Sequence, residues 1–109
     1  YDAALAARDA GEAALAKLLS SYDAIMTPAA PSGAPAGIEA TGDPLFSRLW
    51  TVMRVPTVTL PFGRDTANLP LAFQLVGRFG ADQTLLAHSR VIADHLQISC
   101  EIPKLQPHP

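Results

Sequence analysis

Hydrophobic residues recur at the spacing of an α-helix in three parts of the chain. Residues 2–22 are rich in alanine and free of proline, and alanine is the strongest helix former. In the second half of this segment, apolar side chains at i, i+3, i+4 and i+7 predict one apolar face: Leu15, Leu18, Leu19 and Tyr22. Residues 81–96 predict the last helix, with three inward-facing residues: Leu85, Ile92 and Leu96.

The middle helix has a clear start signal. Asp43 can accept hydrogen bonds from the free N–H groups of the first turn, and Pro44 suits the first helical position. We expect the helix to end before Pro56, because the residue that precedes a proline disfavours helical backbone. Its apolar residues are Leu45, Phe46, Leu49, Trp50 and Met53.

Alternating polar and apolar residues predict two strands. One covers residues 57–62, where Pro61 indicates the end of a strand or a position at a sheet edge. The other covers residues 69–76, with Leu71, Phe73 and Leu75 on one face and Ala72, Gln74 and Val76 on the other. The polar turn between them favours a hairpin, and the short apolar run 24–27, closed by Pro28, predicts a third, buried strand.

The remaining segments predict irregular structure. Residues 28–42 hold three prolines and three glycines and are expected to form a long loop, a kind of segment that is commonly functional. Residues 98–109 hold three prolines and are expected to follow the surface as a tail. Residues 1–109 therefore predict a single α/β segment of three helices and two to three strands. Because so small a sheet is marginal by itself, we expect another segment to complete it.

Composition narrows the classes of function. The chain has 109 residues, 49% of them hydrophobic, and a net charge of −2, which gives no basic field for nucleic acid or for a membrane surface. No apolar run reaches the roughly 18 residues of a membrane span. A single cysteine, Cys100, excludes an internal disulfide and fits a cytoplasmic location. The chain begins at Tyr1, inside the first predicted helix, which indicates a processed protein or a fragment.

Five short segments, in this order and spacing, resemble the signature segments of one enzyme family. They are Tyr22–Pro31 (YDAIMTPAAP), Thr41–Pro44 (TGDP), Leu49–Thr51 (LWT), Val55–Gly63 (VPTVTLPFG) and Leu69–Arg78 (LPLAFQLVGR). The chain resembles the amidase signature family over most of its length, about residues 22–96. The resemblance implies the C-terminal portion of a mixed-sheet α/β/α fold that hydrolyses amide bonds.

The resemblance also implies that the catalytic residues lie outside this chain. Amidases of this family use a Ser–cis-Ser–Lys triad and a glycine- and serine-rich loop that holds the oxyanion. The triad precedes the matched region, and no Gly-Gly-Ser-Ser-type stretch occurs in these residues. We therefore expect no catalytic residue here and no activity from the chain alone, and the resemblance implies no cofactor and no metal.

The helix after Asp43 carries the best candidates for substrate contact. In the resembling enzymes this segment borders the acyl-binding pocket, which implies pocket roles for Phe46, Trp50 and Thr51, with an apolar or aromatic acyl group. The alternative is that Phe46 and Trp50 pack in the core. Arg54 stands where the family commonly has glycine, so that it is either strained at a positive φ or tolerated with its head group in solvent.

Other polar residues favour ordinary structural roles. Lys17, Ser20 and Ser21 are adjacent on a helix end but have no oxyanion-binding loop near them in sequence. His88 and His95 are two helical turns apart, about 10 Å, which is too far for one metal ion. Cys100 has no neighbouring base. The amide of Gln74, on a buried strand, is expected to bind backbone partners.

Two hypotheses from different classes remain. In the first, the chain is the C-terminal part of an amidase-type hydrolase, which pairs with the N-terminal part of the amidase domain and helps to bind a small amide substrate. In the second, it is a non-catalytic interaction module that pairs with another chain. A small autonomous hydrolase that uses Cys100 or Ser20 is the least favoured option. In isolation, the chain is expected to associate with itself through exposed apolar edges.

Overall fold

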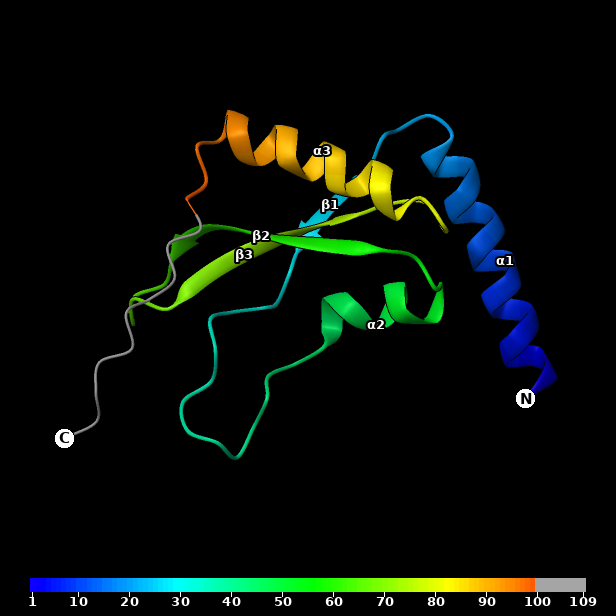
Figure 1. The fold of residues 1–109 in the computed structure, drawn as a ribbon. Helices are drawn as coiled ribbons and strands as arrows, with labels where there is room; N and C mark the ends of the chain where they lie inside the picture. Colours follow the sequence, from blue (N-terminus) through cyan, green and yellow to red (C-terminus); the bar gives the residue numbers. More distant parts are fainter. Residues whose placement is uncertain (100–109) are drawn as a thin grey trace.

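The computed structural model describes residues 1–99, so Cys100 and nearly all of the expected tail at 98–109 lie outside the described residues. Three helices and three strands follow one another along this range (Figure 1). The elements are α1 (Asp2–Leu19), β1 (Ile25–Pro28), α2 (Leu45–Val52), β2 (Thr57–Arg64), β3 (Pro70–Val76) and α3 (Asp82–His95). The α/β class predicted from the sequence is therefore confirmed.

The three strands form one antiparallel sheet in the order β1-β3-β2. The predicted hairpin is present, because β2 pairs with β3 from Thr57 opposite Val76 to Arg64 opposite Pro70. The register shifts between Pro61 and Gly63, which is the irregularity expected where a proline cannot donate to the ladder. Among residues 1–99, β1 and β2 each pair on one side only, so both are edge strands.

Figure 1 shows α3 on one face of the sheet and α2 on the other. The α3 face holds the main core, because alternate residues of the strands point to it and meet α3. Its buried members are Leu60, Phe73, Leu75 and Leu85. Ile92 of α3 packs against this cluster, as its helical spacing predicts. The predicted inward position of Leu96 is wrong, because α3 ends at His95 and Leu96 lies exposed just beyond it.

Helix α1 runs beside the sheet rather than over it (Figure 1). Leu15 and Leu19 are buried as predicted, but Leu18 and Tyr22 are exposed. The helix ends at Leu19 in a tightened turn, in which the N–H groups of Ser20 and Ser21 donate to the carbonyl oxygens of Lys17 and Leu18. Arg78 Nε donates a hydrogen bond of 2.8 Å to the Leu19 carbonyl oxygen at this end. The predicted apolar face is therefore too long, because Tyr22 lies beyond α1, and too wide, because Leu18 lies within α1 and is exposed.

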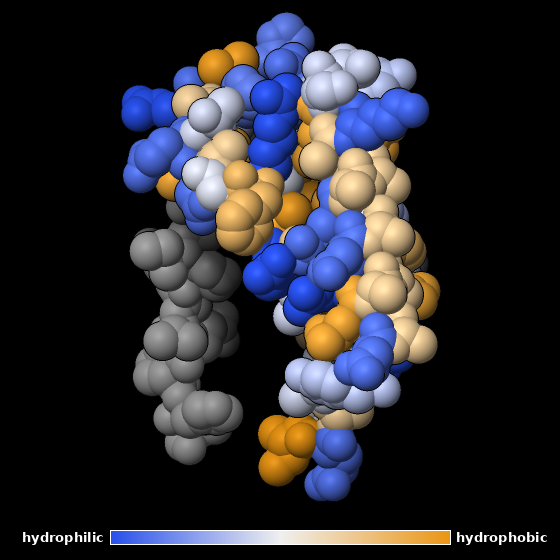
Figure 2. All heavy atoms as spheres, turned by 90° about the vertical axis from the view of Figure 1, so that its right-hand side faces the viewer, coloured by the Kyte–Doolittle hydropathy of each residue, from blue (hydrophilic) through white to orange (hydrophobic). Residues whose placement is uncertain are grey.

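The surface on the α1 side is mixed. Figure 2, in which α1 faces the viewer, shows a hydrophilic column beside a moderately hydrophobic one, as expected of an alanine-rich helix. Within residues 1–99, no helix has both the length and the apolar character that crossing a membrane requires. The same residues contain no cluster of three or more histidine, cysteine or acidic side chains that could hold a metal ion.

Candidate functional site

Helix α2 starts and ends through local contacts. The Leu45 N–H donates to Asp43 Oδ1 at 3.0 Å, so Asp43 satisfies a free donor of the first turn as the sequence predicts. At the other end, the N–H groups of Arg54 and Val55 donate to the carbonyl oxygens of Thr51 and Trp50. This pair of bonds is the Schellman motif, which closes a helix with a left-handed residue.

The two faces of α2 have different surroundings. Phe46 and Trp50, one turn apart, are half-buried. About 100° around the helix from them, three apolar residues at i, i+4 and i+7 lie about half-exposed and form what we call the outer stripe: Leu45 (57%), Leu49 (49%) and Val52 (53%). An apolar stripe of this spacing normally faces a partner surface, and among residues 1–99 this one remains open to solvent.

Gln74 of β3 ties the sheet to α2. Its side chain is buried, with 3% exposure. The Nε2 group donates to the carbonyl oxygen of Phe46 at 2.6 Å and to that of Pro28 at 3.3 Å. One amide thus joins β1, β3 and the first turn of α2, and the predicted structural role of Gln74 is confirmed.

Two further polar groups on this side have unused hydrogen-bonding capacity. The Thr27 hydroxyl and the Trp50 Nε1 group are buried, and neither has a hydrogen-bond partner within the described part of the chain. Thr27 lies opposite Gln74 in the β1–β3 register, so the two side chains share a face. Buried polar groups are normally satisfied, and such exceptions call for an explanation.

A wide hollow lies beside α2, at the base of the long loop. It has a volume of about 550 Å³ and is lined by residues 29–35 and 41–44 with the start of β3 at 70–72. Residues 29–44 contain no helix or strand. Phe46, Trp50 and Thr51 do not line this hollow, and Thr51 is exposed with its hydroxyl bonded to the Ser47 carbonyl oxygen at 3.1 Å. Their pocket role stays a prediction.

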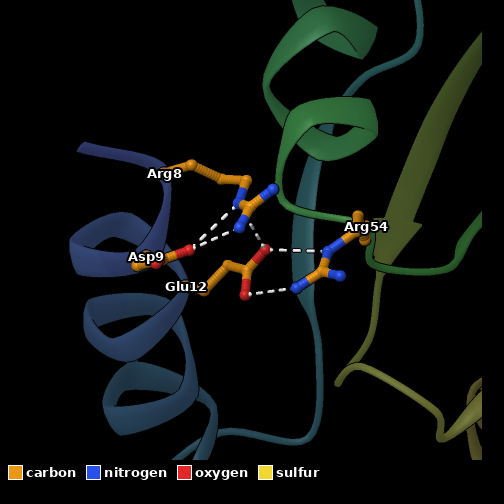
Figure 3. Close-up of polar contacts among 4 residues, drawn as sticks. All are labelled: Arg8, Asp9, Glu12 and Arg54. Atoms are coloured by element: carbon orange, nitrogen blue, oxygen red, sulfur yellow. Dashed lines mark hydrogen bonds and ion pairs between the residues drawn. The ribbon is translucent and has the colours of Figure 1, made fainter. Parts of the chain in front are cut away.

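Arg54 has a φ of 56°. This is the positive φ that was expected if the position suits glycine. Its guanidinium also makes specific contacts (Figure 3). The Nε and Nη2 groups donate to the two Glu12 oxygens at 3.0 and 2.9 Å, and the guanidinium lies 5.5 Å from the centre of the Phe79 ring. The hydrogen bond from Arg54 is the main cause that lowers the pKa of the Glu12 carboxyl, and the same bond raises the pKa of Arg54.

The sequence did not indicate the partner of Arg54 in this ion pair. Glu12 lies on α1, 42 residues before Arg54, and Phe79 lies in the turn after β3. Arg8, one turn before Glu12, approaches the same carboxylate at 3.6 Å, so two guanidinium groups share one acid. The only available clue was the unusual arginine itself.

The remaining candidates lie apart from α2. The Ser20 hydroxyl donates to the Lys17 carbonyl oxygen at 2.6 Å, which is the geometry of a helix end. His88 is half-buried beside a hollow of about 240 Å³ that Asp23, Arg78 and Thr84 also line. His95 is exposed near the end of α3. These positions bring no nucleophile and base together within residues 1–99.

Comparisons with known proteins point in one direction. No family profile matches the chain. Two similar proteins are glutamyl-tRNA(Gln) amidotransferase A subunits. The one from Gluconobacter oxydans is 35% identical over 83 residues, which cover 70% of this chain and 17% of the relative. The one from Granulibacter bethesdensis is 38% identical over 96 residues, or 82% of this chain and 18% of the relative.

A solved structure agrees with these relatives. Among the glutamyl-tRNA(Gln) amidotransferase A subunits, the crystal structure of the Thermotoga maritima protein matches with a TM-score of 0.57 and 31% sequence identity. The match covers 88% of this chain and 20% of that structure. The chain therefore spans about a fifth of the length of the relatives that it matches.

Proposed function

Because the chain belongs to the amidase signature family and matches the C-terminal part of amidotransferase A subunits, we propose that it completes the sheet and one wall of the substrate pocket in an enzyme that hydrolyses amide bonds. The observation that carries this proposal is the match of 88% of the chain to one fifth of a solved relative. The rest of the fold, with the Ser–cis-Ser–Lys triad, is supplied by the N-terminal part of the domain.

The unpaired edges of the sheet support the proposal that a further segment packs beside it. Both edge strands have one side without a strand partner among residues 1–99, and an unpaired edge is a ready template for further pairing. The outer stripe of α2 adds an apolar surface that a second body of protein would cover. Together these features fit a segment that packs against a larger part of the same enzyme.

The chemistry is divided between the two parts. In the proposed enzyme the lysine, acting through the cis-serine, removes a proton from the nucleophilic serine, and backbone N–H groups hold the tetrahedral oxyanion. The present chain supplies the shape of the acyl pocket through Phe46 and Trp50, with Thr51 at its rim. An aromatic wall favours an apolar or aromatic acyl group by contact area and stacking. The Trp50 N–H and the Thr27 hydroxyl are then available to a polar group of the substrate or of the other wall.

The direct test is the coding sequence that precedes Tyr1. We expect an in-frame lysine codon followed, at a distance, by a glycine- and serine-rich segment with two serines. The polypeptide that includes this segment should hydrolyse aryl amides, and Trp50→Ala should raise KM for them by about tenfold, while Val91→Ala, on the exposed face of α3, should leave KM unchanged. An in-frame stop codon at this place would overturn the proposal.

The outer stripe also favours the second candidate, a non-catalytic module that pairs with a separate chain. The same coding sequence distinguishes the two. A stop codon upstream of Tyr1, together with a stable complex between this chain and another polypeptide, would establish the module. A continuous open reading frame with the triad would exclude it.

A further inference from the structure

Two helices of this molecule end in the same backbone geometry. In α2 the left-handed residue is Arg54, with φ 56°, and in α3 it is Gln97, with φ 53°. In both helices the two N–H groups that close the Schellman motif bond back to the last turn; in α3 those of Gln97 and Ile98 donate to Asp94 and Ala93. The position suits glycine, because a side chain crowds the backbone when φ is positive.

The side chains at these two positions differ in what they reach. Gln97 is exposed at the end of α3. Arg54 instead spans to α1, where it holds both oxygens of Glu12, and lies over the Phe79 ring. A bidentate arginine–carboxylate pair fixes direction as well as distance. The backbone conformation is therefore common to both caps, and the connection to another helix belongs to Arg54.

The ion pair between Arg54 and Glu12 spans a region where α1 and the end of α2 are incompletely packed. A cleft of about 290 Å³ separates α1 from the end of α2, with Leu15 and Leu19 on one side and Met53 and Val55 on the other. Next to Glu12, Gly11 lies so close to the Met53 side chain that a Cβ would collide with it. Helix α1 thus meets the end of α2 at a few points, and Arg54 is the only one of them with directional hydrogen bonds among residues 1–99.

We propose that Arg54 is a positioning residue that fixes the angle of α2, and so the Phe46–Trp50 pocket wall, against α1. The significance for the pocket rests on the proposed function; the mechanical link between α1 and α2 does not. The carboxylate of Glu12 receives the guanidinium and Phe79 supports it from the side. Loss of either charged group frees α1 to move relative to α2 and leaves the sheet core in place.

Hydrogen exchange on the 109-residue chain tests the link between α1 and α2 that Arg54 and Glu12 form. Arg54→Gly and Glu12→Gln should each raise the exchange rates of amides in residues 6–16 by roughly two- to fivefold, the range expected of an exposed ion pair, with exchange in β3 unchanged. The matched control is Gln97→Gly, which is made at the equivalent left-handed cap position of α3. It should leave exchange in α1 unchanged. The charge-exchanged pair Glu12→Arg with Arg54→Glu should restore only part of the protection, because a carboxylate then lies over Phe79 and a second guanidinium lies one turn from Arg8. Unchanged α1 exchange in Arg54→Gly, or equal loosening in Gln97→Gly, would overturn the proposal.

Kinetics test the consequence for the pocket. In the longer amidase polypeptide, Arg54→Gly should raise KM for aryl amides several-fold, by about the amount of a misplaced apolar contact, and change kcat little. Arg54→Lys should be intermediate, because an ammonium group lacks the planar fork. If the wild-type polypeptide hydrolyses no amide, the proposed function fails while the exchange data still decide the link. If KM does not respond although α1 loosens, the pocket part of the inference is wrong.

Discussion

The two faces of the sheet are built in different ways. On the α3 face, apolar side chains from two strands and one helix interlock and are almost fully buried. On the α2 face, one amide, that of Gln74, bridges three elements, two buried polar groups lack partners among residues 1–99, and the outer stripe remains exposed. On α3 itself, His88 Nδ1 is also buried without a partner among residues 1–99, but it lies outside the interlocked apolar cluster. The α3 face has the features of a core, and the α2 face has those of one half of an interface.

This difference indicates where each kind of mutation acts. Apolar burial is non-directional and scales with area, so the α3 face should determine the stability of the isolated chain. A face held by a few directional bonds contributes less stability and more specific orientation. The α2 face should therefore determine what the chain binds and how its helices are oriented.

The strongest test of the comparison is Leu85→Ala on the α3 face. Leu85 is 2% exposed and packs beside Gly77, just after β3, so its truncation leaves a cavity. We expect a loss of about 2–5 kcal/mol in the free energy of unfolding, measured by urea denaturation. Leu86→Ala, at an exposed neighbour, should stay within about 0.5 kcal/mol of wild type. Equal losses in the two variants would contradict the assignment of the core.

Gln74→Leu tests the α2 face. The substitution keeps volume but removes the donor to the carbonyl oxygens of Phe46 and Pro28. We expect a loss of about 1–3 kcal/mol, because two acceptors lose a buried partner, together with a red shift of Trp50 fluorescence as α2 loosens. Gln83→Leu, on the exposed side of α3, is the control and should change neither quantity. A loss larger than that of Leu85→Ala would remove the distinction between the faces.

Local patterns predicted most of the fold. The alternation along residues 57–62 and 69–76 predicted the hairpin and its two faces correctly, because strand periodicity depends on the chain itself. Asp43 and Pro44 predicted the start of α2 for the same reason. The errors concern where helices end and which side chains tertiary packing covers: Leu96 lies beyond the cap of α3, and Leu18, although on α1, is exposed.

The candidate site was less accessible to sequence reasoning. The buried amide of Gln74 was expected to need partners, but its partner on α2 could not be named, because that contact joins residues 28 positions apart. The ion pair of Glu12 and Arg54 left only one trace, an arginine in a glycine-like position. The pocket role of Phe46, Trp50 and Thr51 stays a prediction, because a pocket needs a second wall and the proposal assigns that wall to another part of the enzyme.

Asp43→Ala is expected to have a smaller effect, limited to α2. The Asp43 carboxylate accepts the Leu45 N–H at 3.0 Å, and its removal leaves that donor to solvent. A lost cap of this kind costs about 1 kcal/mol, and chemical denaturation together with backbone amide shifts of residues 45–48 would measure it. Glu39→Ala, in the exposed loop, should leave both readouts unchanged. If the two variants behave alike, the cap does not hold the first turn of α2.

The outer stripe gives the smallest expected effect on stability and the clearest separation of the two faces. Because Leu49 is half-exposed, Leu49→Ser should change the free energy of unfolding by no more than about 0.5 kcal/mol. It should nevertheless weaken self-association of the isolated chain, measured by sedimentation velocity over a range of concentrations, because the stripe is the apolar surface that a second body would cover. Val91→Ser, on the more exposed outer side of α3, supplies the matched change. If both substitutions weaken association equally, the outer stripe is ordinary surface, and the proposal that the α2 face is an interface is wrong.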